Sequence, residues 1–286
     1  MNFPKYITEE KLQQFIRQAF LEDVGDGDHS TLACVPYDSI QEAELKIKDN
    51  GIIAGIELAK IIFDTFDPDL KIEQFLNDGD KVQFGDVAFK IKGSSQSILT
   101  CERLVLNCMQ RMSGIATYAN QMMDLVKGTN AKILDTRKTT PNFRMLEKWA
   151  VLIGGAENHR FGLYDMVMLK DNHVDFCGTI TKAVSQTKEY LKTNHLDLKI
   201  EVETRNLTEV KEALEANIDV IMLDNFSIEQ LKEAVAFINH RVKTEASGGI
   251  TKESVREIAE TGVDFISSGA IIHSAPNFDL SLKAIK

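Results

Sequence analysis

Residues 199–226 read KIEVETRNLTEVKEALEANIDVIMLDNF, and this stretch decides the expected fold. A short apolar run ends at Glu203, and a second run ends at Asp224. Between them, residues 207–216 carry apolar side chains at spacings of three and four, which is the period of an amphipathic helix. Strand, helix and strand in this order predict two parallel strands of one sheet, joined by a helix.

The same pattern recurs along the C-terminal part of the chain. Short apolar, β-branched runs occupy residues 131–134, 166–169, 199–202, 219–223, 243–246 and 264–266. Helical patterns lie between them at residues 207–216, 228–238 and 254–261. The polar residues that end four of the runs, at 203, 224, 247 and 268, are 21, 23 and 21 positions apart. These intervals favour a (β/α) barrel, with a doubly wound sheet as the alternative, and barrel enzymes place their chemistry at the carboxyl ends of the strands.

The first hundred residues have a different pattern. A helix is predicted over residues 8–21, and a second one, entered at a glycine, over residues 51–64. Strand-like runs occupy residues 42–49, 81–82 and 87–92, with Gly-Asp turns between the last ones, and a helical stripe covers residues 101–119. We therefore expect a sandwich-like N-terminal α+β domain over residues 1–112 and the barrel domain over residues 113–286. The last dozen or so residues are expected to pack back on the N-terminal domain.

Composition excludes several classes of protein. The chain has 286 residues, of which 43% are hydrophobic and 7% aromatic, values typical of a globular protein. No apolar run approaches the roughly 20 residues of a membrane helix, and the N-terminus lacks the pattern of a secretion signal. The four cysteines form neither a C-x-x-C pair nor a metal-finger spacing, so we expect reduced thiols in a cytoplasmic protein. A net charge of −10 argues against nucleic-acid binding.

Arginine is unevenly distributed in this acidic chain. Within 58 residues lie five of the nine arginines, namely Arg103, Arg111, Arg137, Arg144 and Arg160. The densest polar segment among them is Asp135-Thr136-Arg137-Lys138-Thr139-Thr140-Pro141, which follows a predicted strand. An arginine offers a planar fork for carboxylate or phosphate, and a lysine offers a point charge. The segment therefore predicts an anion site, and the alternative is a solvated, salt-bridged face.

Two further segments carry adjacent polar groups. Residues 154–160 bring His159 and Arg160 together after a glycine turn, although a single histidine is more often a structural group. Residues 168–173 place Lys170 at the end of a predicted strand. Each segment is weak evidence alone, and their joint placement after strands is what favours a binding site.

Carboxylates end the two strands of the opening stretch. Glu201 and Glu203 point to the same side of their strand, and we select Glu203 because it is nearer the carboxyl end. Together with Asp224 it suits magnesium, which proteins hold through one or two carboxylates plus substrate phosphates or hydroxyls. A diphosphate substrate is implied by this pairing, and capping of the following helices is the alternative.

Small residues end the last two strands. Ser247-Gly248-Gly249 and Ser267-Ser268-Gly269-Ala270 could bring backbone N–H groups close to an anion. A phosphate site formed by the loops after the last strands is a recurrent feature of barrels. Either segment alone would be an ordinary turn.

Taken together, these segments closely resemble the quinolinate phosphoribosyltransferase family, also called nicotinate-nucleotide pyrophosphorylase (carboxylating), over nearly the whole chain. The resemblance rests on Glu102-Arg103, residues 107–116, Thr136-Arg137-Lys138-Thr139, Asn158-His159-Arg160, Leu169-Lys170-Asp171-Asn172-His173, Val202-Glu203, Leu223-Asp224-Asn225, Ser247-Gly248-Gly249 and Ser268-Gly269-Ala270. Glu22-Asp23 and residues 27–31 also look like the N-terminal signature of that family. The order and spacing of so many segments are much more specific than any one of them.

The resemblance implies an incomplete barrel of six to seven strands and an enzyme of de novo NAD synthesis. Quinolinate and phosphoribosyl pyrophosphate would give nicotinate mononucleotide, pyrophosphate and carbon dioxide, with Mg²⁺ as cofactor. Quinolinate would be bound by Arg137, His159, Arg160, Lys170 and, from the neighbouring subunit of a homodimer or larger assembly, Arg103. The phosphoribosyl donor and its metal would be bound by Lys138, Glu203, Asp224, Ser247, Gly248, Gly249, Gly269 and His273. Thr136, Ser268 and Ala270 would also contact substrate. Catalytic roles would fall to Lys138, Glu203 and Asp224, of which the two carboxylates would also hold the metal.

Two rival functions are weighed against this one. A nicotinate-specific phosphoribosyltransferase would need fewer cations, because nicotinate has one carboxylate. A non-catalytic, transport-associated paralogue would not need Lys138, Glu203 and Asp224, all of which are present. Asn142 and Ala156 stand where the family commonly has glycine, and we expect them to change loop shape without removing a charged site residue.

Overall fold

The computed structural model describes residues 3–285, and these form two compact units. The first unit contains residues 3–120, 140–155 and 275–285, and the second contains residues 121–139 and 156–274. No helix in this described part of the chain is both long and apolar enough to cross a membrane.

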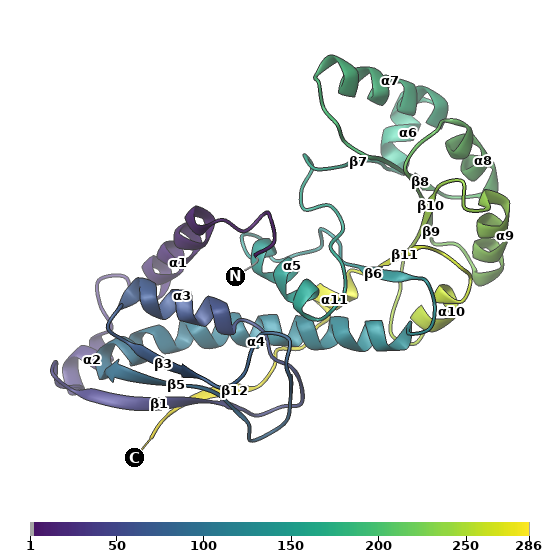
Figure 1. Ribbon diagram of the computed structural model, residues 1–286. Helices are drawn as coiled ribbons and strands as arrows, with labels where there is room; N and C mark the ends of the chain where they lie inside the picture. Colours follow the sequence, from purple (N-terminus) through teal and green to yellow (C-terminus); the bar gives the residue numbers. More distant parts are fainter. Residues whose placement is uncertain (1–2, 286) are drawn as a thin grey trace. The chain divides into compact units, whose positions relative to one another are not determined.

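The second unit is built on a parallel sheet of six strands. The strands are β6 (Lys132–Leu134), β7 (Val167–Leu169), β8 (Ile200–Thr204), β9 (Val220–Asp224), β10 (Lys243–Ser247) and β11 (Phe265–Ser267). Their spatial order is β6-β11-β10-β9-β8-β7, without the reversal of strand order that defines a doubly wound sheet. Figure 1 shows the strands following a curve whose two ends are β6 and β7, which is an incomplete barrel. The predicted fold class is confirmed, and each predicted strand lies within two residues of an observed one.

Helices cover the outer side of this sheet (Figure 1). They are α6 (Asp171–Cys177), α7 (Ile180–Thr193), α8 (Leu207–Glu215), α9 (Ile228–Ile238) and α10 (Val255–Ala259), and a short α11 (Ala270–His273) follows the last strand. The side chains of Thr179, Asn206 and Ser227 accept backbone N–H groups at the starts of α7, α8 and α9. Apolar positions such as Val210 and Leu231 are buried against the sheet, so local caps and an apolar stripe together position each helix.

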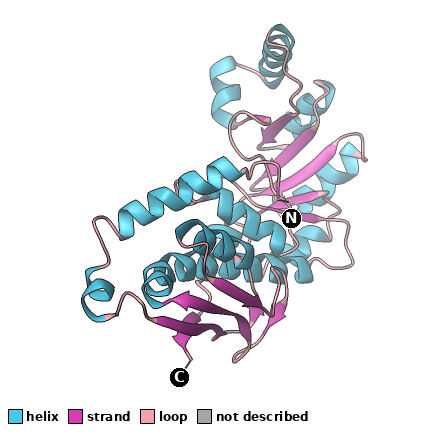
Figure 2. Ribbon diagram, turned by 60° about the vertical axis from the view of Figure 1, so that its left-hand side comes forward, coloured by secondary structure: helices cyan, strands magenta, loops and turns pink. Residues whose placement is uncertain are grey.

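The first unit contains a four-stranded antiparallel sheet in the order β12-β1-β5-β3. Its strands are β1 (Ile40–Ile47), β3 (Lys71–Gln74), β5 (Val87–Ser94) and β12 (Leu280–Ala284), and a small pair is formed by β2 (Gly51–Ile52) and β4 (Lys81–Val82). The helices of this unit are α1 (Glu9–Asp23), α2 (His29–Cys34), α3 (Ile56–Phe66), α5 (Arg144–Ile153) and most of α4 (Ser95–Leu125). Figure 2 shows helices packed over one face of this sheet. Alternate residues of β1, namely Ala43, Leu45 and Ile47, are buried there, as expected for a sheet with one covered face.

The predicted start of the second helix is wrong. Gly51 begins the strand β2, and the helix α3 starts after Gly55, whose φ of 96° lies in the left-handed region that favours glycine. The carboxylate of Asp78 accepts the backbone N–H of Ile56 at 2.8 Å and so stabilises this later start. Because the cap lies more than twenty residues away in sequence, local patterning did not reveal it.

The compact units differ from a simple division of the chain at residue 112. Residues 140–155 belong to the first unit because Glu147, which is fully buried in α5, binds Arg111 of α4. Its Oε1 accepts hydrogen bonds from Nε and Nη2 of Arg111 at 3.0 and 2.9 Å, and its Oε2 accepts the N–H of Thr140 at 2.8 Å. Residues 275–285 belong to the same unit because β12 pairs antiparallel with β1.

Gly114 offers a test of this packing. A Cβ at Gly114 would overlap the carbonyl oxygen of Pro276, which leads into β12. Gly114→Ala should therefore lower the free energy of unfolding by about 1–3 kcal/mol, the usual cost of overpacking. Thermal melting followed by circular dichroism should show a fall of roughly 2–12 °C. Asp124→Ala, at an exposed position of the same helix, serves as the control, and an unchanged melting temperature for Gly114→Ala would contradict the close approach.

Candidate active site

A cavity of about 550 Å³ opens at the carboxyl ends of the parallel strands, and all of its lining residues belong to the second unit. Every predicted site residue lines it except Arg103, Ala270 and His273. It is also lined by residues that we did not predict, namely Met168, Met222, Asn225, Glu245, Ile250 and Ser267. The structure therefore brings most of the dispersed segments to one place.

The three remaining residues have different positions. Ala270 and His273 lie in α11, immediately beyond the pocket residue Gly269. A Cβ at Gly269 would lie 3.0 Å from both Cδ2 of His273 and Cδ of Lys138, so these two side chains meet over the glycine. Arg103 is exposed on α4 in the first unit and is not among the residues that line the pocket.

Two guanidinium groups lie close together in this site. Nε of Arg137 is buried and has no hydrogen-bond partner among the described residues. Burial and the positive charge of Arg137 lower the pKa of Arg160, whose Nη1 donates to the carbonyl of Met166 at 3.1 Å. A buried donor without a partner and two neighbouring like charges are both unfavourable, and a bound anion would relieve both.

Asp135 connects the two segments that carry these arginines. It is fully buried directly after β6, and its carboxylate accepts the N–H of His159 at 2.8 Å and Nδ2 of Asn158 at 2.7 Å. A backbone bridge between Leu134 and Glu157 supports the same connection. Asp135 thus positions residues 158–160 beside residues 136–138, a role that the sequence analysis did not assign.

A second buried cluster lies at the wall of the pocket. Nε2 of His159 is 3.0 Å from Oε2 of Glu201 and 3.5 Å from Oε2 of Glu245, and its Nδ1 accepts the N–H of Arg160 at 2.7 Å. Burial, in part offset by His159, raises the pKa of the Glu201 carboxyl to about 7. Sequence reasoning missed both carboxylates. For Glu201 the available signal was a charged residue between Ile200 and Val202, whereas Glu245 lies in a mostly polar strand and gave no such signal.

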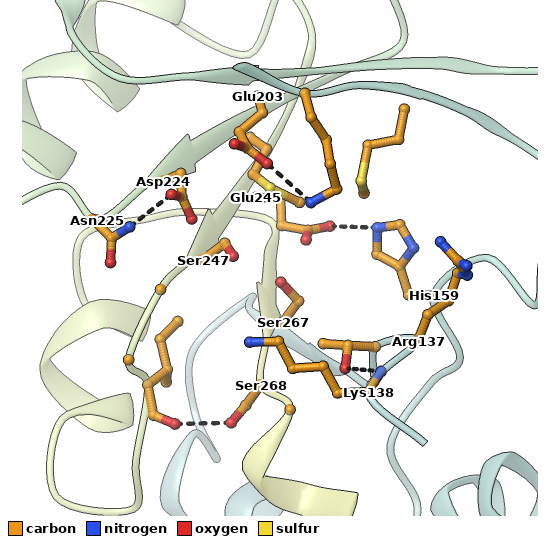
Figure 3. A pocket seen from close by; sticks show the side chains of 18 of the residues that line it. Arg137, Lys138, His159, Glu203, Asp224, Asn225, Glu245, Ser247, Ser267 and Ser268 are labelled. Atoms are coloured by element: carbon orange, nitrogen blue, oxygen red, sulfur yellow. Dashed lines mark hydrogen bonds and ion pairs between the residues drawn. The ribbon is translucent and has the colours of Figure 1, made fainter. Parts of the chain in front are cut away.

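Glu203 and Asp224 lie on the other side of the pocket from Arg137 and His159 (Figure 3). They end the neighbouring strands β8 and β9. Oε2 of Glu203 is 3.3 Å from Nζ of Lys170, and Oδ2 of Asp224 accepts Nδ2 of Asn225 at 2.6 Å. The two carboxylates are only partly buried, so their oxygens can reach a cation or hydroxyl in the pocket.

The turns after the last strands provide close backbone approach. Gly248 has a φ of 101°, and a Cβ there would overlap Oδ1 of Asn225 and lie 3.0 Å from its backbone nitrogen. The buried hydroxyl of Ser268 donates to the carbonyl of Ile250 at 2.8 Å and ties the two turns together. Glycine at position 248 thus lets the backbone of the two turns come close together, and such turns can present backbone N–H groups to a phosphate.

Comparison with known families covers both parts of the chain. A model of the C-terminal domain of quinolinate phosphoribosyl transferases matches residues 115–283, and a model of the N-terminal domain matches residues 28–113. The chain belongs to the quinolinate phosphoribosyltransferase family. The family resemblance stated from the sequence is thereby confirmed.

Individual relatives of the quinolinate phosphoribosyltransferase family agree with this assignment. Quinolinate phosphoribosyltransferase (decarboxylating) 1b of Nicotiana tabacum is 48% identical over 288 residues, covering 95% of this chain and 82% of the relative. NadC from Streptococcus pyogenes has a TM-score of 0.92 at 36% identity, with 98% of this chain and 99% of that chain covered. The nicotinate-nucleotide pyrophosphorylase from Francisella tularensis has a TM-score of 0.91 at 36% identity, with 100% of both chains covered.

In this quinolinate phosphoribosyltransferase fold, the adjacent residues Gly248 and Gly249 give a matched pair of variants. Gly248→Ala forces Asn225 away from Asp224, whereas Gly249→Ala meets nothing within 4 Å and only strains a backbone with φ of 61°. We expect the loss of kcat/KM for the phosphoribosyl donor to be about 5- to 140-fold larger for Gly248→Ala, because overpacking costs about 1–3 kcal/mol and each 1.4 kcal/mol is about tenfold. Steady-state kinetics of both variants measures this difference, and equal losses would contradict it.

Proposed function

We propose that this chain is a quinolinate phosphoribosyltransferase, which converts quinolinate and phosphoribosyl pyrophosphate into nicotinate mononucleotide, pyrophosphate and carbon dioxide. One observation carries the proposal. A single pocket holds two neighbouring arginines on one side and two carboxylates on the other, with glycine turns at the ends of the last strands. Membership of the family supports the same conclusion, as does a match over 95% of this chain and 82% of the relative from Nicotiana tabacum.

The arginine side would bind the pyridine dicarboxylate. Arg137 and Arg160 each offer a planar fork that can bind a carboxylate through two hydrogen bonds. Quinolinate has two adjacent carboxylates, so its charge matches the two guanidinium groups, whereas nicotinate would leave one of them without a counter-charge. Lys170, which lines the same pocket, would add a third cation once it leaves Glu203.

The glycine side would bind the phosphoribosyl donor. Lys138 lies beside Gly269 and His273, where it would neutralise the charge that develops on the departing pyrophosphate. The turns formed by Ser247, Gly248 and Gly249, and by Ser268, Gly269 and Ala270, would donate backbone N–H groups to the phosphates. Thr136, whose hydroxyl accepts the N–H of Lys138 at 3.0 Å, would orient that segment.

Glu203 and Asp224 would hold magnesium. Their oxygens end adjacent strands and face the pocket, and no histidine or cysteine lines that side among the described residues. A site of oxygen donors alone suits a hard divalent cation. When bound, the ion would neutralise diphosphate charge and favour its departure.

The chain's own residues account for the remaining steps. As pyrophosphate leaves, positive charge develops on the ribose, and Glu203 and Asp224 stabilise it. The ring nitrogen of quinolinate, held by Arg137 and Arg160, then bonds to the ribose carbon and becomes cationic. The bond between C2 and its carboxylate breaks, and carbon dioxide leaves. The electron pair stays on C2 beside the positive nitrogen until C2 takes up a proton, so no further cofactor is required.

Arg103 would complete the quinolinate site of a neighbouring subunit in a homodimer. Mixing tests this arrangement, because an Arg103→Ala chain and a Lys138→Ala chain would form hybrid dimers with one native site each. If the two chains are inactive alone, random mixing should restore about a quarter of wild-type activity, since half the dimers are hybrids. Lack of recovery would contradict a site shared between subunits.

A cytoplasmic location stays a prediction from the sequence.

A direct assay tests the function. The purified chain is given quinolinate labelled in its C2 carboxylate, phosphoribosyl pyrophosphate and Mg²⁺, and labelled carbon dioxide and nicotinate mononucleotide are measured. Both products should form together and should stop when a chelator removes the metal. Turnover of nicotinate but not quinolinate would favour the nicotinate-specific alternative, and no turnover of either would favour a non-catalytic protein.

A further inference from the structure

Both ring nitrogens of His159 are directed at protein atoms. Nδ1 accepts the N–H of Arg160 at 2.7 Å, and Nε2 faces the carboxylates of Glu201 and Glu245. An N–H directed at Nδ1 requires a lone pair there, so the ring proton lies on Nε2, which is 3.0 Å from Oε2 of Glu201 and 3.5 Å from Oε2 of Glu245. Neither nitrogen is left to face a ligand, in contrast to the expectation that His159 binds quinolinate directly.

The two acids come from strands that are not neighbours. Glu201 is in β8 and Glu245 is in β10, with β9 between them, and both side chains are almost completely buried. Oε1 of each carboxylate has no hydrogen-bond partner among the residues that the structure describes. Buried carboxylates with so few partners destabilise a fold relative to an apolar core. Their presence at the wall of the pocket therefore indicates a role in the site rather than in stability.

We propose that Glu201 and Glu245 are positioning residues, which fix the orientation of His159 so that its Nδ1 holds the backbone N–H of Arg160 in the quinolinate-binding wall. The inference rests on the proposed function. The segment is fixed from two sides, since Asp135 accepts the N–H of His159 while the ring of His159 accepts the N–H of Arg160. The negative charge of Glu201 also favours the charged form of Arg160 and opposes the effect of Arg137.

Metal binding would be the other use of such a cluster. One ligand atom each from His159, Glu201 and Glu245 lies within 4.8 Å of the others. A metal on Nε2 would replace the ring proton, and a metal-bound histidine normally donates its second nitrogen's proton to an acceptor. Here the second nitrogen faces a donor, the N–H of Arg160, so the geometry favours the hydrogen-bonded arrangement.

Two substitutions at Glu201 separate positioning from simple packing. Glu201→Leu keeps the volume but removes the acceptor, whereas Glu201→Gln keeps an oxygen for Nε2 of His159. For Glu201→Leu we expect the KM for quinolinate to rise by about tenfold or more, with the KM for phosphoribosyl pyrophosphate within about threefold of wild type. For Glu201→Gln, both KM values should stay within about threefold of wild type. The same is expected for Glu215→Gln, an exposed control in the same unit. Equal effects of Leu and Gln would overturn the proposal.

A spectroscopic measurement tests the same point without turnover. In ¹⁵N spectra of the histidine rings, the signal that disappears in His159→Gln should show a protonated Nε2 and an unprotonated Nδ1 at neutral pH. A protonated Nδ1 would overturn the proposal. Failure of the wild-type enzyme to turn over quinolinate would reject the proposed function and not the positioning role. In that case the affinity of each variant for quinolinate would be measured by calorimetry and compared. If Glu201→Leu does not fold, Glu245→Leu and Glu245→Gln replace the pair.

Discussion

Arg137→Ala should lower kcat/KM for quinolinate by about 30- to 4000-fold, the largest effect that we expect from one substitution. The physical reason is that Nε of Arg137 is buried without a hydrogen-bond partner in residues 3–285, so it would be available to a bound ligand. Truncating one partner of a buried, hydrogen-bonded charge pair costs about 2–5 kcal/mol, and each 1.4 kcal/mol is about tenfold. The loss should be larger for quinolinate than for any ligand with one carboxylate.

Steady-state kinetics and calorimetry measure this effect. The affinity for phosphoribosyl pyrophosphate and the melting temperature should stay close to wild type, because Arg137 Nε makes no hydrogen bond within the part of the chain that the structure describes. Arg137→Lys keeps the charge but loses the planar fork, so its activity should be intermediate. Arg17→Ala, at an exposed position of α1, is the control for loss of an arginine. Near-normal turnover by Arg137→Ala would contradict the assignment of the arginine side to quinolinate.

The parallel sheet could be predicted because its signals are local. Each strand is a short apolar run, and each following helix has its own cap and apolar stripe. The helix α9 was predicted with its observed bounds, Ile228–Ile238, from apolar residues at spacings of three and four. In the structure, Ser227 and Gln230 form a capping box at its start. By contrast, the start of α3 depends on Asp78 and the placement of α5 depends on Arg111, both distant in sequence. Interactions of that kind leave no local pattern.

The same distinction applies to the site. Residues at strand ends, such as Glu203 and Asp224, were predicted because polar side chains interrupt an apolar pattern where a barrel places its chemistry. Glu201 was correctly expected on the same side as Glu203, but its burial was not expected. It does not line the pocket, and it lies behind His159 and Glu245, which do. Asp135 was quoted as part of a polar segment, yet its role depends on residues 158–159. The sequence thus predicted the residues at the rim of the site, whereas the buried residues that position them were identified only in the structure.

Asp224→Asn should lower kcat by about 100- to 1000-fold, the usual loss when a preorganised electrostatic group is removed. The amide can still accept Nδ2 of Asn225 through its oxygen, so the turn should keep its shape while the negative charge is lost. Because that charge is proposed to act on magnesium and on the developing ribose cation, the Mg²⁺ concentration for half-maximal rate should rise as kcat falls. Quinolinate affinity, measured by calorimetry, should stay unchanged.

Glu203→Gln should behave differently from Asp224→Asn, although both remove one carboxylate from the same side of the pocket. Glu203 also pairs with Lys170 at 3.3 Å, so the substitution releases a cation that is proposed to bind quinolinate. We therefore expect a similar fall in kcat but tighter quinolinate binding, whereas Asp197→Asn, at an exposed position, should change neither. Weaker quinolinate binding in Glu203→Gln would show that Lys170 needs Glu203 to hold its position. The sign of this change therefore decides whether the ion pair competes with quinolinate for Lys170 or prepares Lys170 to bind it.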